Sequence, residues 1–94
     1  MKEATIIHPD STEEKVSPAN GNDFQLEEVQ KIVGGYIEVI ELSDGNLLVC
    51  NEEGKLMSLP ENPKATEIAK KHEAIFADDY FVGNVLMCSD DMLL

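Results

Sequence analysis

A tight hairpin constrains this chain more than any other feature of its sequence. The apolar segment at residues 36–42 is followed by Ser43-Asp44-Gly45-Asn46 and then by a second apolar segment that ends at Cys50. Asp-Gly is a preferred pair for a two-residue type I′ turn, because both central residues must adopt positive φ. The sequence therefore predicts two antiparallel strands joined by a turn at Asp44 and Gly45.

A two-residue turn also determines which residues of the two strands face each other. It places Glu38 directly opposite Asn51, on a strand face that otherwise carries mainly apolar residues. A carboxylate on such a face costs free energy unless it is hydrogen-bonded or partly hydrated. Asn51 can donate to this carboxylate, and Lys55, just beyond the strand, can neutralise it.

Three interpretations of this polar group stay open. It is a structural pair that stabilises the strand register, or the floor of a small pocket for a donor-bearing ligand or peptide, or simply a solvent-exposed pair. Asn62 can reach the same end of the sheet, and Glu52 lies in the adjoining turn. The candidate ligand-binding residues are therefore Glu38, Asn51, Glu52, Lys55 and Asn62.

Before the hairpin, the sequence predicts a short strand at residues 3–8, a poor edge strand at residues 13–17 and a loop at residues 17–22. A helix is expected to begin near Asp23, a suitable N-cap. An apolar stripe at helical spacing follows, and Gly34 ends the helix in the left-handed conformation, with Gly35 leading into the strand. The stripe consists of Leu26, Val29, Ile32 and Val33.

After the hairpin, the sequence predicts a turn at residues 52–55 in which Gly54 supplies positive φ, and then a short extended piece over Leu56, Met57 and Leu59. Asn62 and Pro63 form a typical helix start, with Asn as the cap and Pro in the first turn. A loop at residues 77–79, a strand at residues 80–88 and a tail at residues 89–94 complete the chain.

These elements predict a single small α+β domain over residues 1–94. Its order is β(β)αββαβ, with two helices packed on a mostly antiparallel sheet of four to five strands. Residues 1–22 hold the short strands and loop, residues 23–88 the core, and residues 89–94 the tail.

The chain is strongly acidic. Its net charge is −12, and all seven cations are lysines. Such a chain is repelled by phosphate backbones, so direct nucleic-acid binding is disfavoured. High solubility is the simpler interpretation of this charge. The alternative is a nucleic-acid mimic that occupies a DNA-binding host protein, although the carboxylates are spread along the chain in ones and twos.

Other classes of site find little support in the sequence. No apolar run approaches the roughly 20 residues that span a bilayer, and the N-terminus does not resemble a signal peptide, so we expect a cytoplasmic protein. Cys50 and Cys88 match neither a CxxC motif nor a zinc set and are expected to be reduced, buried thiols. No catalytic set, cofactor motif or metal set is present, which leaves an enzyme with Glu38 as general base as a minor alternative.

Three ordered blocks of residues carry a family resemblance. They are Val33-Gly34-Gly35-Tyr36-Ile37-Glu38-Val39, Asn51-Glu52-Glu53-Gly54-Lys55-Leu56, and Leu59-Pro60-x-Asn62-Pro63-x-Ala65-Thr66. Together they resemble the signature of domain of unknown function 3846. The resemblance implies a setting in bacteria, their phages or mobile elements, and it supplies no activity and no role for any single residue.

The function that we expect is that of a small, non-enzymatic accessory protein that binds a partner protein or a small ligand. The absence of a catalytic set and the setting that the resemblance implies support this expectation. We expect no membrane association. The chain is a monomer or a homodimer, because an exposed strand edge or the apolar end at Met92-Leu93-Leu94 can either pair with a second copy or be covered internally.

Overall fold

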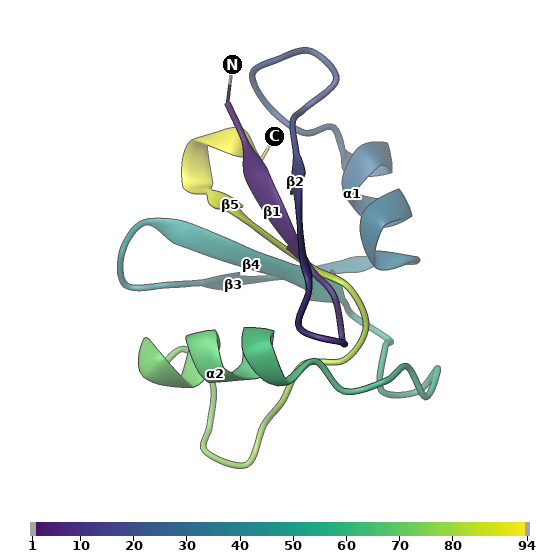
Figure 1. Cartoon of the computed structure of the whole chain (residues 1–94), viewed down its shortest axis with the longest axis vertical. Coiled ribbons are helices and arrows are strands. Elements are labelled where there is room, and N and C mark those ends of the chain that lie inside the picture. Colours follow the sequence, from purple (N-terminus) through teal and green to yellow (C-terminus); the bar gives the residue numbers. More distant parts are fainter. Residues whose placement is uncertain (1, 94) are drawn as a thin grey trace.

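The computed structural model describes residues 2–93. It shows two helices packed on an antiparallel sheet of five strands, which confirms the predicted α+β class (Figure 1). The elements in chain order are β1 (Ala4–Ile7), β2 (Glu13–Val16), α1 (Leu26–Val33), β3 (Ile37–Glu41), β4 (Asn46–Asn51), α2 (Pro63–Lys71), β5 (Val85–Ser89) and a 3₁₀ turn, η1 (Asp90–Met92).

The strand order across the sheet is β2-β1-β5-β4-β3, and every neighbouring pair is antiparallel. β5 therefore lies between the two hairpins of the chain and joins them into one sheet. β2 and β3 form the two edges. An isolated two-stranded hairpin is only marginally stable. The β1–β2 and β3–β4 hairpins form one stable sheet because β5 pairs with both β1 and β4.

Each helix covers a different face of the sheet. α1 packs Val29 on a cluster that contains Leu47, Val49 and Leu86. α2 packs Ala65 and Ala69 on the opposite face. The second cluster also contains Ile7, Leu48, Cys50, Phe81 and Val85. Because both faces are covered, the central strands β4 and β5 are apolar on both sides, as buried strands must be.

The two helices begin differently. α2 begins as predicted, with Pro63 in its first turn and the Asn62 side chain accepting a hydrogen bond from the Ala65 amide. The prediction for α1 was wrong by two residues, because Gln25 and not Asp23 is its N-cap, in a capping box with Glu28. Phe24 explains the shift, since it is buried in the core and its amide donates to the Met92 carbonyl at 2.7 Å.

The hairpin is present, but its predicted register was wrong by one residue. The loop has three residues, with Leu42 donating to Asn46 across it and Gly45 at φ +86°. This is the loop in which a residue with positive φ follows a type I turn. Glu38 consequently pairs with Cys50, and Asn51 pairs with Ile37. Glu38 and Asn51 do not face each other.

Two predictions after the hairpin were also wrong. Gly54 does not have positive φ. It is needed for close packing, because a Cβ there would lie 2.7 Å from Val82 Cγ2. The extended piece at residues 56–59 is absent, since residues 52–58 form consecutive turns. In these turns the Leu59 amide donates to the Gly54 carbonyl at 3.2 Å.

The last strand is shorter than the predicted residues 80–88, because it begins only at Val85. Gly83, at φ +72°, interrupts the extended backbone. The end of the chain then packs against the domain: Met92 is buried beside α1, and Leu93 forms a bridge with Phe24. Leu94, which the sequence placed in the same tail, lies outside the described residues.

Candidate functional site

A shallow pocket opens beside the edge strand β3, on the sheet face that α2 covers. Its volume is about 130 Å³. Four of the five candidate ligand-binding residues line it, namely Glu38, Asn51, Glu52 and Lys55. The remaining wall comes from a segment far along the chain, and it consists of Ile75, Asp79, Tyr80, Phe81 and Val82, with Ile40 and Cys50 beneath. The two walls of the pocket therefore come from segments that are distant in the sequence and meet only in the folded domain.

Glu38 enters this pocket because of the observed register. It alternates with Ile37 and Val39, so it projects toward the α2 side of the sheet with Ile40. The thiol of Cys50 lies opposite it on β4, with Sγ 4.0 Å from Glu38 Oε1. Within residues 2–93, neither Glu38 nor Glu52 forms an ion pair. Both carboxylates are thus left to water or to a ligand.

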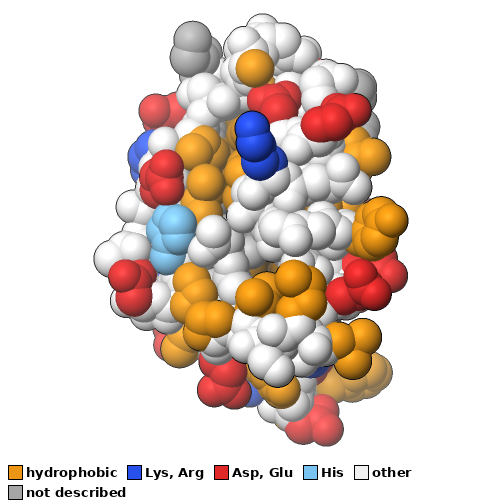
Figure 2. Space-filling model, turned by 90° about the vertical axis from the view of Figure 1, so that its right-hand side faces the viewer, with side chains coloured by type: hydrophobic (Ala, Val, Ile, Leu, Met, Phe, Trp, Pro, Cys, Tyr) orange, Lys and Arg blue, Asp and Glu red, His pale blue; other side chains and the backbone are white. Residues whose placement is uncertain are grey.

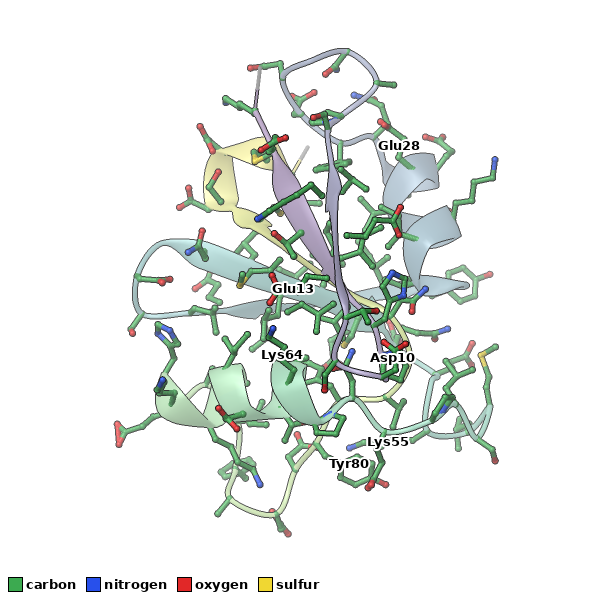
Figure 3. The ribbon with its side chains drawn as sticks, viewed as in Figure 1. Asp10, Glu13, Glu28, Lys55, Lys64 and Tyr80 are labelled. Carbon is green, nitrogen blue, oxygen red and sulfur yellow. The ribbon has the colours of Figure 1, made fainter. Side chains whose placement is uncertain are left out.

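Lys55 closes the outer side of the pocket. Its ammonium lies 2.6 Å from Asp79 Oδ1 and 4.3 Å from the centre of the Tyr80 ring. Figure 3 shows Lys55 and Tyr80 beside each other. The hydrogen bond to Asp79 raises the pKa of Lys55, and the same bond lowers the pKa of Asp79. This ion pair and the cation–π contact tie the turns at residues 52–58 to the loop that precedes β5. The ion pair of Lys55 is therefore with Asp79 and not with Glu38.

Asn51 lines the pocket, but its side chain supports the surrounding backbone. Nδ2 donates to the Val33 carbonyl at 3.2 Å, and Oδ1 accepts from the Glu53 amide at 2.8 Å. Gly35 is needed beside it, because a Cβ there would lie 3.0 Å from Asn51 Nδ2. Asn51 thus connects the end of α1 to the turn that carries Glu52 and Lys55.

The structure does not bring Asn62 to the pocket. Its side chain is fully buried, and Nδ2 donates to the carbonyls of Ile7 and Gly83, each at 2.8 Å. Oδ1 accepts from the Ala65 amide at 3.1 Å. Asn62 therefore joins β1, the segment before β5 and the start of α2, and its polar atoms are occupied within the protein.

The thiol beneath the pocket is poorly suited to nucleophilic chemistry. Burial, together with the negative charge of Glu38, raises the pKa of Cys50 to about 12. Burial also raises the pKa of Cys88 to about 11. Reactive cysteines have the opposite property, a pKa lowered by nearby positive charge. Cys50 is therefore a poor candidate for a nucleophile in this pocket.

This raised pKa gives a direct prediction about thiol reactivity. Both thiols are free and buried, and reaction requires the thiolate. At pH 8 we expect the folded protein to react with iodoacetamide at least about a hundredfold more slowly than the protein unfolded in urea. Mass spectrometry over time measures both rates. Similar rates in the two states would contradict this description of Cys50 and Cys88.

One polar cluster that the sequence did not indicate lies at the other end of α2. His72 Nδ1 lies 2.7 Å from Ser43 Oγ, and its Nε2 lies 3.8 Å from Asp44 Oδ2. The second distance is too long for a hydrogen bond, and Asp44 accepts from the Asn46 amide at 3.1 Å. We therefore interpret this cluster as a contact that attaches the hairpin loop to α2, and not as a catalytic triad.

The described part of the chain also lacks two other classes of feature, a metal centre and a membrane-spanning helix. No group of three or more His, Cys, Asp or Glu side chains among these residues is placed to hold a metal ion. Among the same residues, no helix combines the length and the apolar character needed to cross a membrane.

Fold and pocket together define a small α+β domain with a pocket beside one sheet edge. The chain belongs to the family of domain of unknown function 3846 (DUF3846), whose model matches residues 1–92. This match confirms the resemblance that the three residue blocks indicate. It also includes the N-terminal strands, which lie outside those blocks. No curated protein and no solved structure matches the chain.

Proposed function

We propose that this protein is a small acidic accessory protein of a phage or mobile element, and that it acts in the cytoplasm by binding a partner protein. The pocket beside β3 takes a lysine or arginine side chain of that partner. The observation that carries the proposal is the pocket itself, in which Glu38 and Glu52 have no ion-pair partner within residues 2–93.

The size of the pocket supports a side chain as its occupant. Pockets for small-molecule ligands usually measure about 300–1,000 Å³. The volume of about 130 Å³ observed here is too small for such a ligand and suits the end of one long side chain. The two carboxylates without an ion pair, Glu38 and Glu52, offer hydrogen-bond acceptors to the charged end of that side chain.

Exposed apolar side chains beside the pocket support a protein partner. Phe76 is 84% exposed and Tyr80 is 40% exposed, both on the loop that forms the pocket wall. Aromatic residues are enriched in protein–protein interfaces. On the side of the molecule shown in Figure 2, hydrophobic side chains gather in the lower half and the carboxylates lie in separate groups. The carboxylates of this face do not form the continuous strip that a mimic of a phosphate backbone needs.

Reversing charge in the pocket tests the proposal. The double variant Glu38→Lys/Glu52→Lys is expected to lose at least about 90% of any partner that co-purifies with the tagged wild-type protein, since two acceptors become repulsive donors. Quantitative mass spectrometry of material purified from the host measures this loss.

The matched control is Glu27→Lys/Glu67→Lys. It makes the same change in net charge at exposed positions on α1 and α2, outside the pocket. This variant is expected to retain the partner. Equal loss in both double variants would show that net charge alone holds the partner, and equal retention would remove the pocket from the interface.

A further inference from the structure

The outer edge of β3 carries unpaired backbone groups beside the pocket. Leu42 donates to Asn46, and Glu52 donates to the Tyr36 carbonyl. Because inward and outward backbone groups alternate along an antiparallel strand, the even-numbered residues of β3 bond to β4. The amides and carbonyls of Ile37, Val39 and Glu41 therefore point away from the sheet. No loop or helix within residues 2–93 bonds to them.

The opposite edge of the sheet is protected in a way that β3 is not. On β2, Glu13 pairs with Lys64 from α2 (Figure 3), and Glu14 lies 3.0 Å from His8. Lys15 donates to Thr5 at 3.0 Å. Charged side chains, lysine above all, are the usual means of blocking unwanted strand pairing. β3 has no lysine and leaves Val39 39% exposed at the centre of its edge.

The charge around this edge selects the kind of chain that can pair with it. Residues 32–54 contain no Lys or Arg, whereas Glu38, Glu41, Asp44, Glu52 and Glu53 all lie within them. A second copy of this chain paired through β3 would bring these carboxylates against their own counterparts, which is destabilising. An extended basic segment would instead place a cation opposite Glu38, on the face that carries the pocket.

We propose that β3 is a docking edge on which an extended, lysine- or arginine-containing segment of the partner adds a sixth strand to the sheet. This inference rests on the proposed function and specifies how the partner binds. Backbone hydrogen bonds to Ile37, Val39 and Glu41 supply affinity. The side chain opposite Glu38 enters the pocket and supplies specificity, because alternate side chains of an added strand point to the same face.

A pair of synthetic peptides tests strand addition without the natural partner. The probe is an N-acetylated, C-amidated peptide of four Lys-Thr repeats, and its matched control has four Glu-Thr repeats. We expect the lysine peptide to slow amide hydrogen exchange at Ile37, Val39 and Glu41 by at least about tenfold, as new hydrogen bonds form. The glutamate peptide is expected to leave these rates unchanged. Absence of added protection at these three amides, or of binding at about 1 mM peptide, would overturn the proposal.

Val39→Pro provides the matching variant. Proline removes the outward amide and is tolerated on an edge strand where the amide faces solvent. Val39→Pro is expected to lower the affinity for the lysine peptide by at least about tenfold. Val39→Thr, which retains the amide, is expected to keep an affinity within about twofold of the wild-type value. Equal binding by both variants would overturn strand addition. If Val39→Pro unfolds the domain, the exchange measurement on the wild-type protein still decides.

The two levels of the proposal fail separately. Loss of the natural partner in Glu38→Lys/Glu52→Lys but not in Val39→Pro would retain the pocket and remove strand addition. Concentration-dependent protection of β3 without peptide would show that the occupant is a second copy of the chain, and it would overturn the basic segment.

Discussion

Replacing Asn62 by alanine is expected to lower the free energy of unfolding by at least about 3 kcal/mol. The side chain is fully buried, and it donates to the backbone carbonyls of two residues that are themselves buried, Ile7 and Gly83. Each unsatisfied buried acceptor costs about 1–3 kcal/mol, and loss of an N-cap adds about 1 kcal/mol. The variant also removes the hydrogen bonds by which Asn62 joins the end of β1 to the start of α2.

Urea denaturation followed by circular dichroism measures this change. Asn22→Ala is the matched control, because its side chain is exposed and forms none of the observed hydrogen bonds. The control is expected to stay within about 0.5 kcal/mol of the wild-type protein. A loss below about 1 kcal/mol for Asn62→Ala would mean that the three hydrogen bonds of Asn62 do not hold these segments together.

The second large effect is expected for Asn51→Ala, with a loss of about 2–3 kcal/mol. Its side chain is almost completely buried, and it bonds the Val33 carbonyl and the Glu53 amide. Without it, the end of α1 and the turns at residues 52–58 lose their direct link. Because Glu52 and Lys55 lie in these turns, this variant is also expected to disorder one wall of the pocket.

The same denaturation experiment measures the stability loss, and amide exchange at residues 52–58 measures the local loosening. The exchange in these turns is expected to rise by at least about tenfold, while the exchange in β5 rises only with global stability. An unchanged turn in a stable Asn51→Ala protein would contradict this structural role. Glu38 and Glu52 are therefore the better positions for testing binding.

The sequence predicted the fold class and two helix boundaries because these depend on local chemistry. Asn62 and Pro63 begin α2 by capping and by a fixed φ, and Gly34 ends α1 at φ +86°. These signals act within one helical turn and require nothing from the rest of the chain. The start of α1 depended instead on Phe24, which distant Met92 and Leu93 hold. A local signal at Asp23 could not reveal that contact.

The hairpin register could not be derived from local chemistry. Asp44-Gly45 fits a two-residue turn, and Gly45 equally fits the last position of a three-residue loop. A hydrophobic alternation normally decides between such registers, because a shift of one residue reverses every side chain. Here Leu47, Leu48, Val49 and Cys50 are all buried, since helices cover both faces of β4. Either register was therefore consistent with the sequence.

Four of the five candidate residues line the pocket, but the strand pairing from which they were chosen is not the one observed. Glu38 and Lys55 line the same pocket although Glu38 does not pair with Asn51. The opposite wall, with Asp79 and Tyr80, comes from residues in a segment that the sequence assigned to a loop and a strand. The only local signal for this wall is the acidic pair at residues 78–79 followed directly by Tyr80. Asp79 and Lys55 lie 24 positions apart in the sequence, so local patterns do not predict their ion pair.

The register of β3 places Glu38 in the pocket and directs the backbone of Val39 outward. Amide hydrogen exchange of the free protein, resolved residue by residue by NMR, tests it. We expect Glu38, Ile40 and Leu42 to exchange at least about tenfold more slowly than Ile37, Val39 and Glu41, since only the even-numbered amides bond to β4. The reverse alternation would establish the two-residue turn, and it would contradict both the pocket position of Glu38 and the free edge of β3.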